Sequence, residues 1–453
     1  MYRIWNLHRA RASVVTGLLL LHGGALRADD WPQWLGPERD SVWRETGIVE
    51  EFPAAGLPVR WRTPLGPGFS GPVVAHGRVY VTDRQVLREP ENPGAAWAGG
   101  GGRSFERVLC LNEADGKALW TNQYECPYTI SFGSGPRVAP LVSGGKVYSL
   151  GAEGNLLCLD AQDGKSLWAK DFKKEFRVKA PQWGFAGHPL LDGNRLICLA
   201  SGPGSTAVAF DKDTGTELWR ALTAEEPGYS SPVIFEAGGK RQLILWDADA
   251  LNALDPARGE VYWSVPLKCK SGLSLATPRK LGDLLFVTAF YNGSLMLRLD
   301  PARPAATTLW RTQKVSEMTT THLNAIICTP FLEAGYVYGV CSYGQLRCLK
   351  AETGERVWET FQATTGAGPV RWANAFIVKH GNRFFLANEK GDLIIARLTP
   401  GGYEELSRTH LLDPTNPEPG RRVVWSHPAF ANRRLYARND KEIICVDLAE
   451  GAK

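Results

Sequence analysis

After its first 28 residues the sequence contains no apolar run long enough to cross a membrane as a helix, which takes about 20 residues. It also lacks an excess of either charge. Four of its 52 lysines and arginines lie in residues 1–28, which hold no acid, so the remaining 48 face 47 aspartates and glutamates. Nucleic-acid binding needs a concentrated basic face, and this balance argues against it.

Metal and catalytic motifs are also missing. The nine cysteines include no Cys-x-x-Cys and no adjacent pair, which argues against a zinc ribbon or an attached haem, and their odd number excludes a complete disulfide framework. No Gly-x-Ser-x-Gly elbow occurs. Whether Cys328 pairs with Cys341 stays open. Four cysteines share one position of a repeated motif, as small buried hydrophobic residues do: Cys110, Cys158, Cys348 and Cys445.

Residues 1–28 have the pattern of a secretory signal peptide. Arg3, Arg9 and Arg11 form a basic start, Val14–Leu21 is apolar, and Ala25 and Ala28 in Ala25-Leu26-Arg27-Ala28 provide a small-residue exit. The alternative is an uncleaved anchor, but the apolar stretch is short for a membrane span. We therefore expect cleavage near Ala28, a mature chain that starts near Asp29 and a periplasmic or secreted location, with no transmembrane segment in the mature chain.

The sequence is rich in turn residues and tryptophan, with 48 Gly, 29 Pro and 16 Trp, and these residues recur with a period of about 45–50. Each period begins with a proline before an apolar pair and ends with a tryptophan after an Asp-Gly or Thr-Gly turn. The prolines are at 72, 140, 189, 232, 278, 330 and 428. The tryptophans are at 61, 120, 168, 219, 263, 310 and 358.

Each period contains four short alternating segments separated by glycine turns. In the clearest unit we expect strands at about 138–142, 146–150, 156–160 and 166–170. Four antiparallel strands per period are typical of one blade of a β-propeller. Counting a unit near Phe376 that lacks its proline, the chain has eight. We therefore predict an all-β, eight-bladed propeller of four-stranded antiparallel blades, formed by residues 29–453 as a single domain.

The two ends of the repeat array differ from its middle. The last unit ends near Leu448 without a fourth strand, and Leu57–Trp61 matches that missing strand. We expect the N-terminal segment, residues 29–62, to complete the last blade and so to close the ring. In the first unit, residues 84–106 form an insertion that we expect to be a flexible surface loop.

The motif Asp163-Gly164-Lys165-Ser166-Leu167-Trp168 after Cys158-Leu159-Asp160 resembles the tryptophan-docking motif of pyrroloquinoline-quinone (PQQ) type propellers. That motif occurs in eight-bladed quinoprotein alcohol dehydrogenases and in the non-catalytic B subunit of the outer-membrane barrel-assembly machinery. The stretch from Asp29 to Asp40 resembles exported PQQ-binding-like propellers of planctomycete-type bacteria. Together the resemblance spans about residues 29–450; it is specific for the fold and much less so for activity.

Membership of this group raises the possibility of a quinone cofactor. The resemblance to quinoprotein dehydrogenases implies a calcium ion held by acid and amide oxygens, an aspartate base, a tryptophan floor and often an adjacent Cys-Cys disulfide. The sequence has no adjacent cysteines and no compact cluster of acids, since most acids lie in hairpin turns. We expect no cofactor, no bound metal and no catalytic residues. The predicted function is a non-catalytic binding or assembly scaffold of the periplasm or cell envelope, with a PQQ-dependent dehydrogenase as the alternative.

Aromatic and polar residues gather just before the first strand of each unit, where the chain crosses back to the central channel. Channel mouths of propellers usually bind ligands, so we expect a protein or polysaccharide partner there. The alternative is that these side chains only plug the channel. The candidate ligand-binding residues are Phe69, Trp183, Phe185, His188, Tyr229, His322, Asn324, Arg371, Trp372, Asn374, Trp425 and His427.

Overall fold

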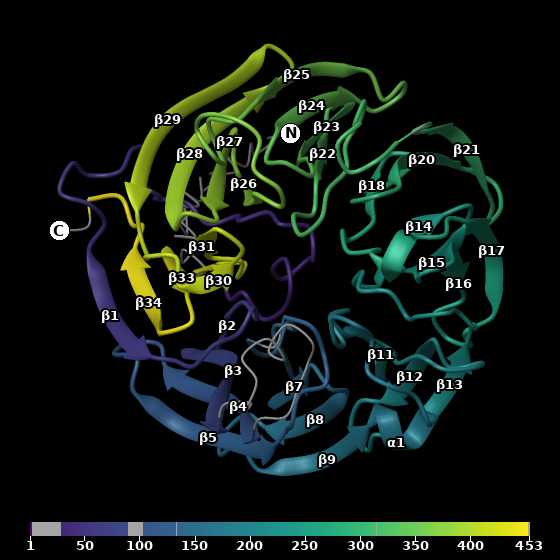
Figure 1. Ribbon diagram of the computed structural model, residues 1–453, viewed down its shortest axis with the longest axis horizontal. Coiled ribbons are helices and arrows are strands. Elements are labelled where there is room, and N and C mark those ends of the chain that lie inside the picture. Colours follow the sequence, from purple (N-terminus) through teal and green to yellow (C-terminus); the bar gives the residue numbers. More distant parts are fainter. Residues whose placement is uncertain (2–28, 89–102, 133, 314, 452–453) are drawn as a thin grey trace.

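Eight four-stranded antiparallel sheets form a closed ring around a central axis in the computed structural model (Figure 1). The structure describes residues 1, 29–88, 103–132, 134–313 and 315–451. The eight-bladed propeller predicted from the repeat is therefore confirmed. The expected signal peptide falls on residues 2–28, outside the described residues, and remains a prediction.

The strands of each blade follow one another from the channel outwards, and all but the last blade use consecutive strands. Blades 1 and 2 comprise β2 (Val73–Ala75), β3 (Arg78–Arg88), β4 (Arg103–Asn112), β5 (Ala118–Glu125), β6 (Leu141–Ser143), β7 (Lys146–Leu150), β8 (Asn155–Asp160) and β9 (Ser166–Asp171). Blades 3 and 4 comprise β10 (Leu190–Asp192), β11 (Arg195–Leu199), β12 (Ala207–Asp211), β13 (Glu217–Ala221), β14 (Val233–Ala237), β15 (Lys240–Trp246), β16 (Ala250–Leu254) and β17 (Val261–Pro266).

The second half of the ring repeats this order. Blades 5 and 6 comprise β18 (Arg279–Leu281), β19 (Leu284–Ala289), β20 (Gly293–Leu299), β21 (Ala306–Arg311), β22 (Phe331–Glu333), β23 (Tyr336–Val340), β24 (Leu346–Lys350) and β25 (Arg356–Thr360). Blades 7 and 8 comprise β26 (Ala375–His380), β27 (Arg383–Asn388), β28 (Asp392–Thr399), β29 (Gly402–His410), β32 (Ala429–Ala431), β33 (Arg434–Arg438), β34 (Glu442–Asp447) and β1 (Val59–Pro64). The connections between blades carry α1 (Phe172–Phe176), the 3-10 turn η2 (Lys270–Gly272) and the hairpin β30 (Asn416–Glu418) with β31 (Arg421–Val423).

The observed strands follow the predicted ones closely, with one consistent difference. The inner strand β6 begins at Leu141 rather than at the predicted Val138, because residues before the opening proline belong to the connection that crosses from the previous blade. In the first blade, part of the predicted surface loop is instead paired: β3 runs to Arg88 and β4 begins at Arg103. Residues 89–102, between them, lie outside the described residues.

The repeated tryptophans join neighbouring blades, as the repeat predicts. Trp120 packs its indole on the next blade's turn and donates from Nε1 to the carbonyl of Ala161 at 3.1 Å. A Cβ at Gly164 would lie 2.5 Å from this indole, and the φ of Gly164 is +75°. Both facts require glycine there, which explains the Asp-Gly half of the motif. Trp61, Trp168, Trp219, Trp310 and Trp358 donate in the same way to the following blade.

The ring is closed by the N-terminal strand, which confirms the predicted closure. β1 pairs antiparallel with β34 as the outermost strand of blade 8 (Figure 1). Trp61 on this strand is buried, and its Nε1 donates to the carbonyl of Glu113 in blade 1 at 2.9 Å. The two ends of the chain thus share one sheet, and that sheet is docked to the first blade.

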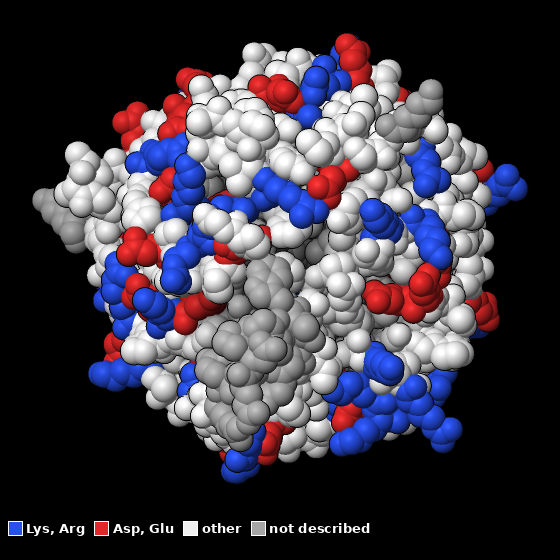
Figure 2. All heavy atoms as spheres, viewed as in Figure 1, with Lys and Arg blue, Asp and Glu red and all other residues white. Residues whose placement is uncertain are grey.

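Hydrophobic clusters fill the spaces between adjacent blades, and all nine cysteines, Cys328 and Cys341 included, are buried free thiols. Lysines and arginines are interspersed with aspartates and glutamates around the face seen in Figure 2. This mixture agrees with the near balance of charge in the sequence. Within the described residues, no helix has the length and apolar character that a membrane crossing needs.

Candidate functional site

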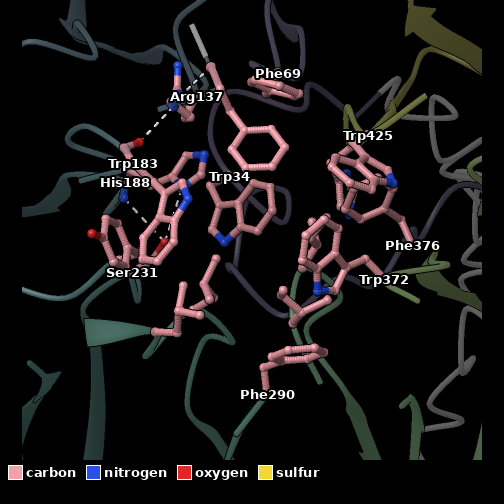
Figure 3. Close-up of a pocket in the computed structure, with 18 of the residues that line it drawn as sticks. Trp34, Phe69, Arg137, Trp183, His188, Ser231, Phe290, Trp372, Phe376 and Trp425 are labelled. Carbon is pink, nitrogen blue, oxygen red and sulfur yellow. Dashed lines mark hydrogen bonds between the residues drawn. The ribbon is translucent and has the colours of Figure 1, made fainter. Parts of the chain in front are cut away.

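A hollow of about 250 Å³ lies at the centre of the ring, where the outer strand of each blade connects to the inner strand of the next. We call it the cup. All eight connections supply at least one lining side chain. Figure 3 shows how aromatic rings from different blades converge on it. The lining residues are Trp34, Phe69, Phe132, Arg137, Trp183, Ala186, His188, Tyr229, Ser231, Leu273, Leu275, Phe290, Tyr291, Ile326, Ile327, Trp372, Phe376, Trp425 and His427.

The floor of the cup comes from the N-terminal segment, residues 29–48, which crosses the channel before it reaches β1 (purple in Figure 1). Asp30 accepts from the backbone N–H of His76 at 3.0 Å, and the carbonyl of Trp43 contacts Nδ1 of His380 at 3.1 Å. Both histidines lie where inner strands end, opposite the connections. The segment therefore covers that end of the channel, and Trp34 reaches back from it into the cup (Figure 3).

Arg39 fastens this segment to the blades from inside the channel. Its guanidinium is buried and donates to the carbonyls of Pro189 and Pro232, each at 3.1 Å. Arg279 completes the link by donating from Nη2 to the carbonyl of Asp40 at 2.6 Å. Burial lowers the pKa of Arg39 to about 10, so the group stays charged at neutral pH. Backbone carbonyls and the side-chain oxygen of Gln33 accept hydrogen bonds from this cation in place of an acid, while its Nε has no partner among the described residues.

Two histidines lie against Trp34. The ring of His188 stacks on it with 4.1 Å between ring centroids, and the ring of His427 meets it edge-on at 5.1 Å. Burial lowers the pKa of His427 to about 4 and that of His188 well below its usual value, so both imidazoles are neutral at pH 7. Each Nε2 is buried without a hydrogen-bond partner among the described residues, as is Nε1 of Trp372.

The one formal charge in the lining belongs to Arg137, which braces the wall. Its Nε donates to the carbonyl of Trp183 at 2.9 Å, and its Nη2 donates to the carbonyls of Ser131 at 2.9 Å and Phe132 at 2.6 Å. Burial lowers the pKa of this guanidinium, while nearby buried carboxylates oppose that effect. Arg137 therefore ties two connections together, and most of its donors are already engaged.

Seven of the twelve residues singled out in the sequence line the cup, and five do not. Those in the cup are Phe69, Trp183, His188, Tyr229, Trp372, Trp425 and His427. Those elsewhere are Phe185, His322, Asn324, Arg371 and Asn374. The structure thus brings together residues from blades far apart in the chain, while their part in ligand binding stays a prediction.

Three of the five lie within or between blades. Phe185 is buried with its ring centroid 5.5 Å from that of Phe172, and Asn374 is buried as well. His322 stacks on Trp310 at 5.1 Å, at the contact between blades 5 and 6. These side chains pack within or between blades and do not line the cup.

The other two support cup residues directly. Asn324 donates from Nδ2 to the carbonyl of Phe290 at 2.8 Å. Arg371 bonds Glu317 at 2.6 Å and lies over the ring of Trp372, 4.3 Å from its centroid. Trp372 itself has a φ of +64°, a conformation that bulky residues rarely adopt. Its indole is therefore held at the wall despite an unfavourable backbone conformation.

Several cup residues escaped the sequence-based prediction. Trp34 belongs to no repeat, and nothing in the sequence shows that the N-terminal segment returns to the channel. Phe290 and Tyr291 come from the turn between the second and third strands of blade 5, not from a connection. For Phe132 and Arg137 a signal was present, because they occupy the connection before β6 in the same way as the predicted residues do.

The residues of the cup do not fit a calcium-bound quinone. Trp34 could serve as a floor, but the lining contains no aspartate, glutamate or asparagine to share a calcium ion with the three carboxylates of PQQ. No group of three His, Cys, Asp or Glu within the described ranges is placed to hold a metal ion. The described lining of the cup therefore offers no coordination site for calcium-bound PQQ.

Comparison with solved structures supports the same fold. BamB from Moraxella catarrhalis has a TM-score of 0.53 at 14% identity, covering 86% of this chain and 99% of that one. The quinohemoprotein alcohol dehydrogenase from Comamonas testosteroni has a TM-score of 0.59 at 14% identity, covering 94% and 81%. The computationally designed protein Ika8 has a TM-score of 0.51 at 11% identity, covering 86% and 100%. At these identities the likeness concerns the fold alone.

The sequence has no significant match among curated proteins. It does match one family model, described as "Outer membrane protein assembly factor BamB", over residues 104–325 and 251–453. Together the two matches run from the third strand of blade 1 to the end of the chain. The chain therefore belongs to the BamB-like family of PQQ-type repeat propellers.

Proposed function

We propose that this protein is a non-catalytic binding or assembly scaffold of the cell envelope, and that it engages its partner or ligand at the cup. The observation that carries the proposal is the convergence of side chains from all eight connections, six of which supply an aromatic ring, on a cavity with unpartnered polar atoms in its wall. A buried polar atom without a partner costs about 1–3 kcal/mol, so a bound group that supplies partners would be favoured.

The proposed cellular location rests on two independent observations. Residues 1–28 have the pattern of an export signal. The family model is named for an outer-membrane assembly factor, a role performed in the envelope. Both support a location in the cell envelope, and cleavage near Ala28 is proposed from the sequence pattern alone.

The test is binding by the mature protein and by a Trp183→Ala, Trp372→Ala double variant. Envelope extract and a glycan array supply protein and polysaccharide partners. Both side chains are half-buried in the cup wall, and large aromatic residues often dominate the energy of an interface. We expect the double variant to bind at least tenfold more weakly, which corresponds to about 1.4 kcal/mol.

Trp263→Ala is the matched control. Trp263 lies on the outer strand β17, and its Nε1 donates to Gln242 of its own blade at 2.7 Å, so its loss leaves the cup intact. The control should bind like the unaltered protein. Equal binding by the double variant would show that the contact surface lies elsewhere on the disk and that the cup is a structural plug.

The second candidate, a quinoprotein dehydrogenase, is favoured only by the position of Trp34 beneath the cup and by the shared fold. The missing calcium ligands weigh against it. A cofactor-binding experiment that separates the two candidates is described in the Discussion.

A further inference from the structure

We propose that the cup binds a small, flat, uncharged aromatic molecule that accepts one hydrogen bond and donates another, with its ring above Trp34. This inference rests on the proposed function and adds the chemical class of the ligand. Neither the family description nor the structural neighbours assign such a ligand to this fold.

The shape and lining of the cup favour a flat apolar molecule. At about 250 Å³ it is smaller than the pockets of about 300–1,000 Å³ that take drug-sized ligands. Indole and phenyl rings form much of its wall and the indole of Trp34 its floor, and such rings pack best against another aromatic ring, offset or edge-on (Figure 3). A sugar of the same size would need partners for several hydroxyl groups. The unpartnered nitrogens of the lining are too few for that.

The hydrogen bonds of the two histidines give them opposite tautomers. Nδ1 of His427 lies 2.6 Å from the carbonyl of Pro428, which can only accept, so Nδ1 carries the hydrogen and Nε2 is an acceptor. Nδ1 of His188 lies 3.1 Å from Oγ of Ser231, and that oxygen already accepts from the backbone N–H of His188. This oxygen could accept a second time, but among the described residues Nδ1 is the one acceptor within reach of the hydroxyl hydrogen. We therefore assign the serine as the donor to Nδ1, which leaves the hydrogen of His188 on Nε2 as a donor.

The cup therefore offers one acceptor and one donor from two neutral imidazoles that both contact the indole of Trp34. Nε1 of Trp372 adds a second donor. A neutral ligand with an N–H or O–H and a carbonyl or ring nitrogen would supply the missing partners. Each match would remove the cost of a buried unsatisfied group.

The charge of the wall favours a neutral ligand as well. The guanidinium of Arg137 donates to backbone carbonyls. Burial lowers its pKa, and the nearby carboxylates of Glu106 and Glu153 partly oppose that shift. An anion would meet a cation whose charge is partly balanced and whose donors are mostly occupied. It would also lose its hydration in an aromatic cavity.

The test uses calorimetric titration of the mature protein with 2-quinolone, a neutral two-ring molecule that carries an N–H beside a carbonyl. Two further probes share its rings: 1-methyl-2-quinolone, which has lost the donor, and quinoline-2-carboxylate, which is an anion. We expect 2-quinolone to bind about tenfold more tightly than the methylated probe. We expect the anion to bind more weakly than 2-quinolone.

His427→Phe keeps a ring and removes the acceptor. In this variant the two quinolones should bind alike, because the ligand N–H has lost its partner. His188→Phe should weaken both probes, since the donor to their carbonyl is gone. His410→Phe, on the exposed outer strand β29, is the matched control and should behave like the unaltered protein.

Three results would overturn the inference. The first is no binding of 2-quinolone, and the second is tighter binding of the anion than of 2-quinolone. The third is the same affinity ratio between 2-quinolone and 1-methyl-2-quinolone in the unaltered protein and in His427→Phe. The comparison in the unaltered protein needs no variant to fold. If these results appear while the Trp183, Trp372 double variant still loses a protein or glycan partner, the ligand class is wrong and the proposed function stands. If that partner binding is also unaffected, both fail.

Discussion

His188 and His427 each precede the proline that opens an inner strand, yet the channel makes them chemically different. Each is nine-tenths buried and neutral. His427 bonds a carbonyl through Nδ1, whereas His188 bonds a hydroxyl, so the free Nε2 of one accepts and that of the other donates. A residue-by-residue reading of the repeat treats the two as equivalent, and only their neighbours distinguish them.

The low pKa of His427 has a consequence for stability. An unfolded histidine has a pKa near 6.5, whereas burial lowers that of His427 to about 4. As the pH falls from 6.5 towards 4, the unfolded chain takes up a proton that the folded protein does not. The folded state should therefore lose up to about 3 kcal/mol across this window, with full stability retained above pH 6.5.

Urea unfolding of the unaltered protein and of His427→Phe between pH 4 and 7 measures this loss. The variant should show a shallower dependence of unfolding free energy on pH, because one buried imidazole no longer has to remain unprotonated. His410, whose pKa is raised by Asp392 and Asp413, loses no stability through protonation in this window. Parallel curves for the two proteins would contradict the assignment.

At the level of the element, the docking tryptophan and the turn glycine act as a pair. Where the glycine is present, as at Gly164, the indole of the previous blade packs on it and reaches a backbone carbonyl. Blade 5 has Pro304 at the corresponding position of its turn, and there Trp263 instead bonds Gln242 within its own blade. At the turn of blade 7, Trp358 still bonds the carbonyl of Thr399, although no tryptophan lies within 4 Å of a Cβ built at Gly401 or Gly402. The hydrogen bond therefore does not require the glycine contact, whereas the close packing of the indole on the turn does.

The strand β1 contributes more to the stability of the ring than its six residues suggest. A chain that starts at residue 65 loses β1 and the buried indole of Trp61, and it leaves the edge of β34 unpaired. Removing a buried tryptophan alone costs about 3–5 kcal/mol. We expect the thermal midpoint to fall by roughly 10 °C or more, together with a tendency to associate through the open edge.

A chain that starts at residue 57 is the control, because it keeps β1 but lacks the segment that crosses the channel. Calorimetry compares the melting temperatures of the two truncated chains. The difference between them gives the stability contributed by β1, which closes the ring, separately from that of the segment that crosses the channel. If both truncated chains melt at the same temperature, β1 contributes nothing beyond the crossing segment, and the closure argument is wrong.

Across the whole molecule, the ring and the segment through its channel define one closed site. The crossing segment pairs with inner strands of blades 1 and 7, which flank blade 8: Trp31 pairs with Val74 of β2, and Val42 pairs with Lys379 of β26. On the other side of the channel, Arg39 reaches the prolines that precede the inner strands of blades 3 and 4. A channel that could have been open at both ends therefore has a floor. Among the described residues, this floor covers the side of the cup that lies opposite the connections.

This arrangement bears on the quinoprotein alternative. Incubation of the purified protein with calcium and PQQ should give no stable quinone absorbance and no dye-linked alcohol oxidation, because the lining lacks oxygens for a calcium ion. A quinoprotein alcohol dehydrogenase reconstituted in parallel is the positive control. Stoichiometric binding of PQQ together with turnover of alcohol would favour the quinoprotein dehydrogenase over the scaffold.

The number of blades and their boundaries could be read from the sequence alone. The opening prolines at 140, 189 and 232 each stand directly before an inner strand, and the turn of Gly164 and the docking of Trp168 follow from the repeated motif. These features depend on contacts within one blade or between successive blades. They recur in most periods, so the sequence contains the same signal many times.

The binding site was decided by tertiary structure. Seven of twelve predicted residues line the cup, while Phe185 and His322 turn into blade contacts, because the connections vary in length and conformation. Trp34 enters from a segment with no repeat. Its place is set by Arg39 and Arg279, whose bonds join residues that lie up to 240 positions apart. A site on the axis of a ring requires the ring to be closed first, and no local pattern records which side chains meet there.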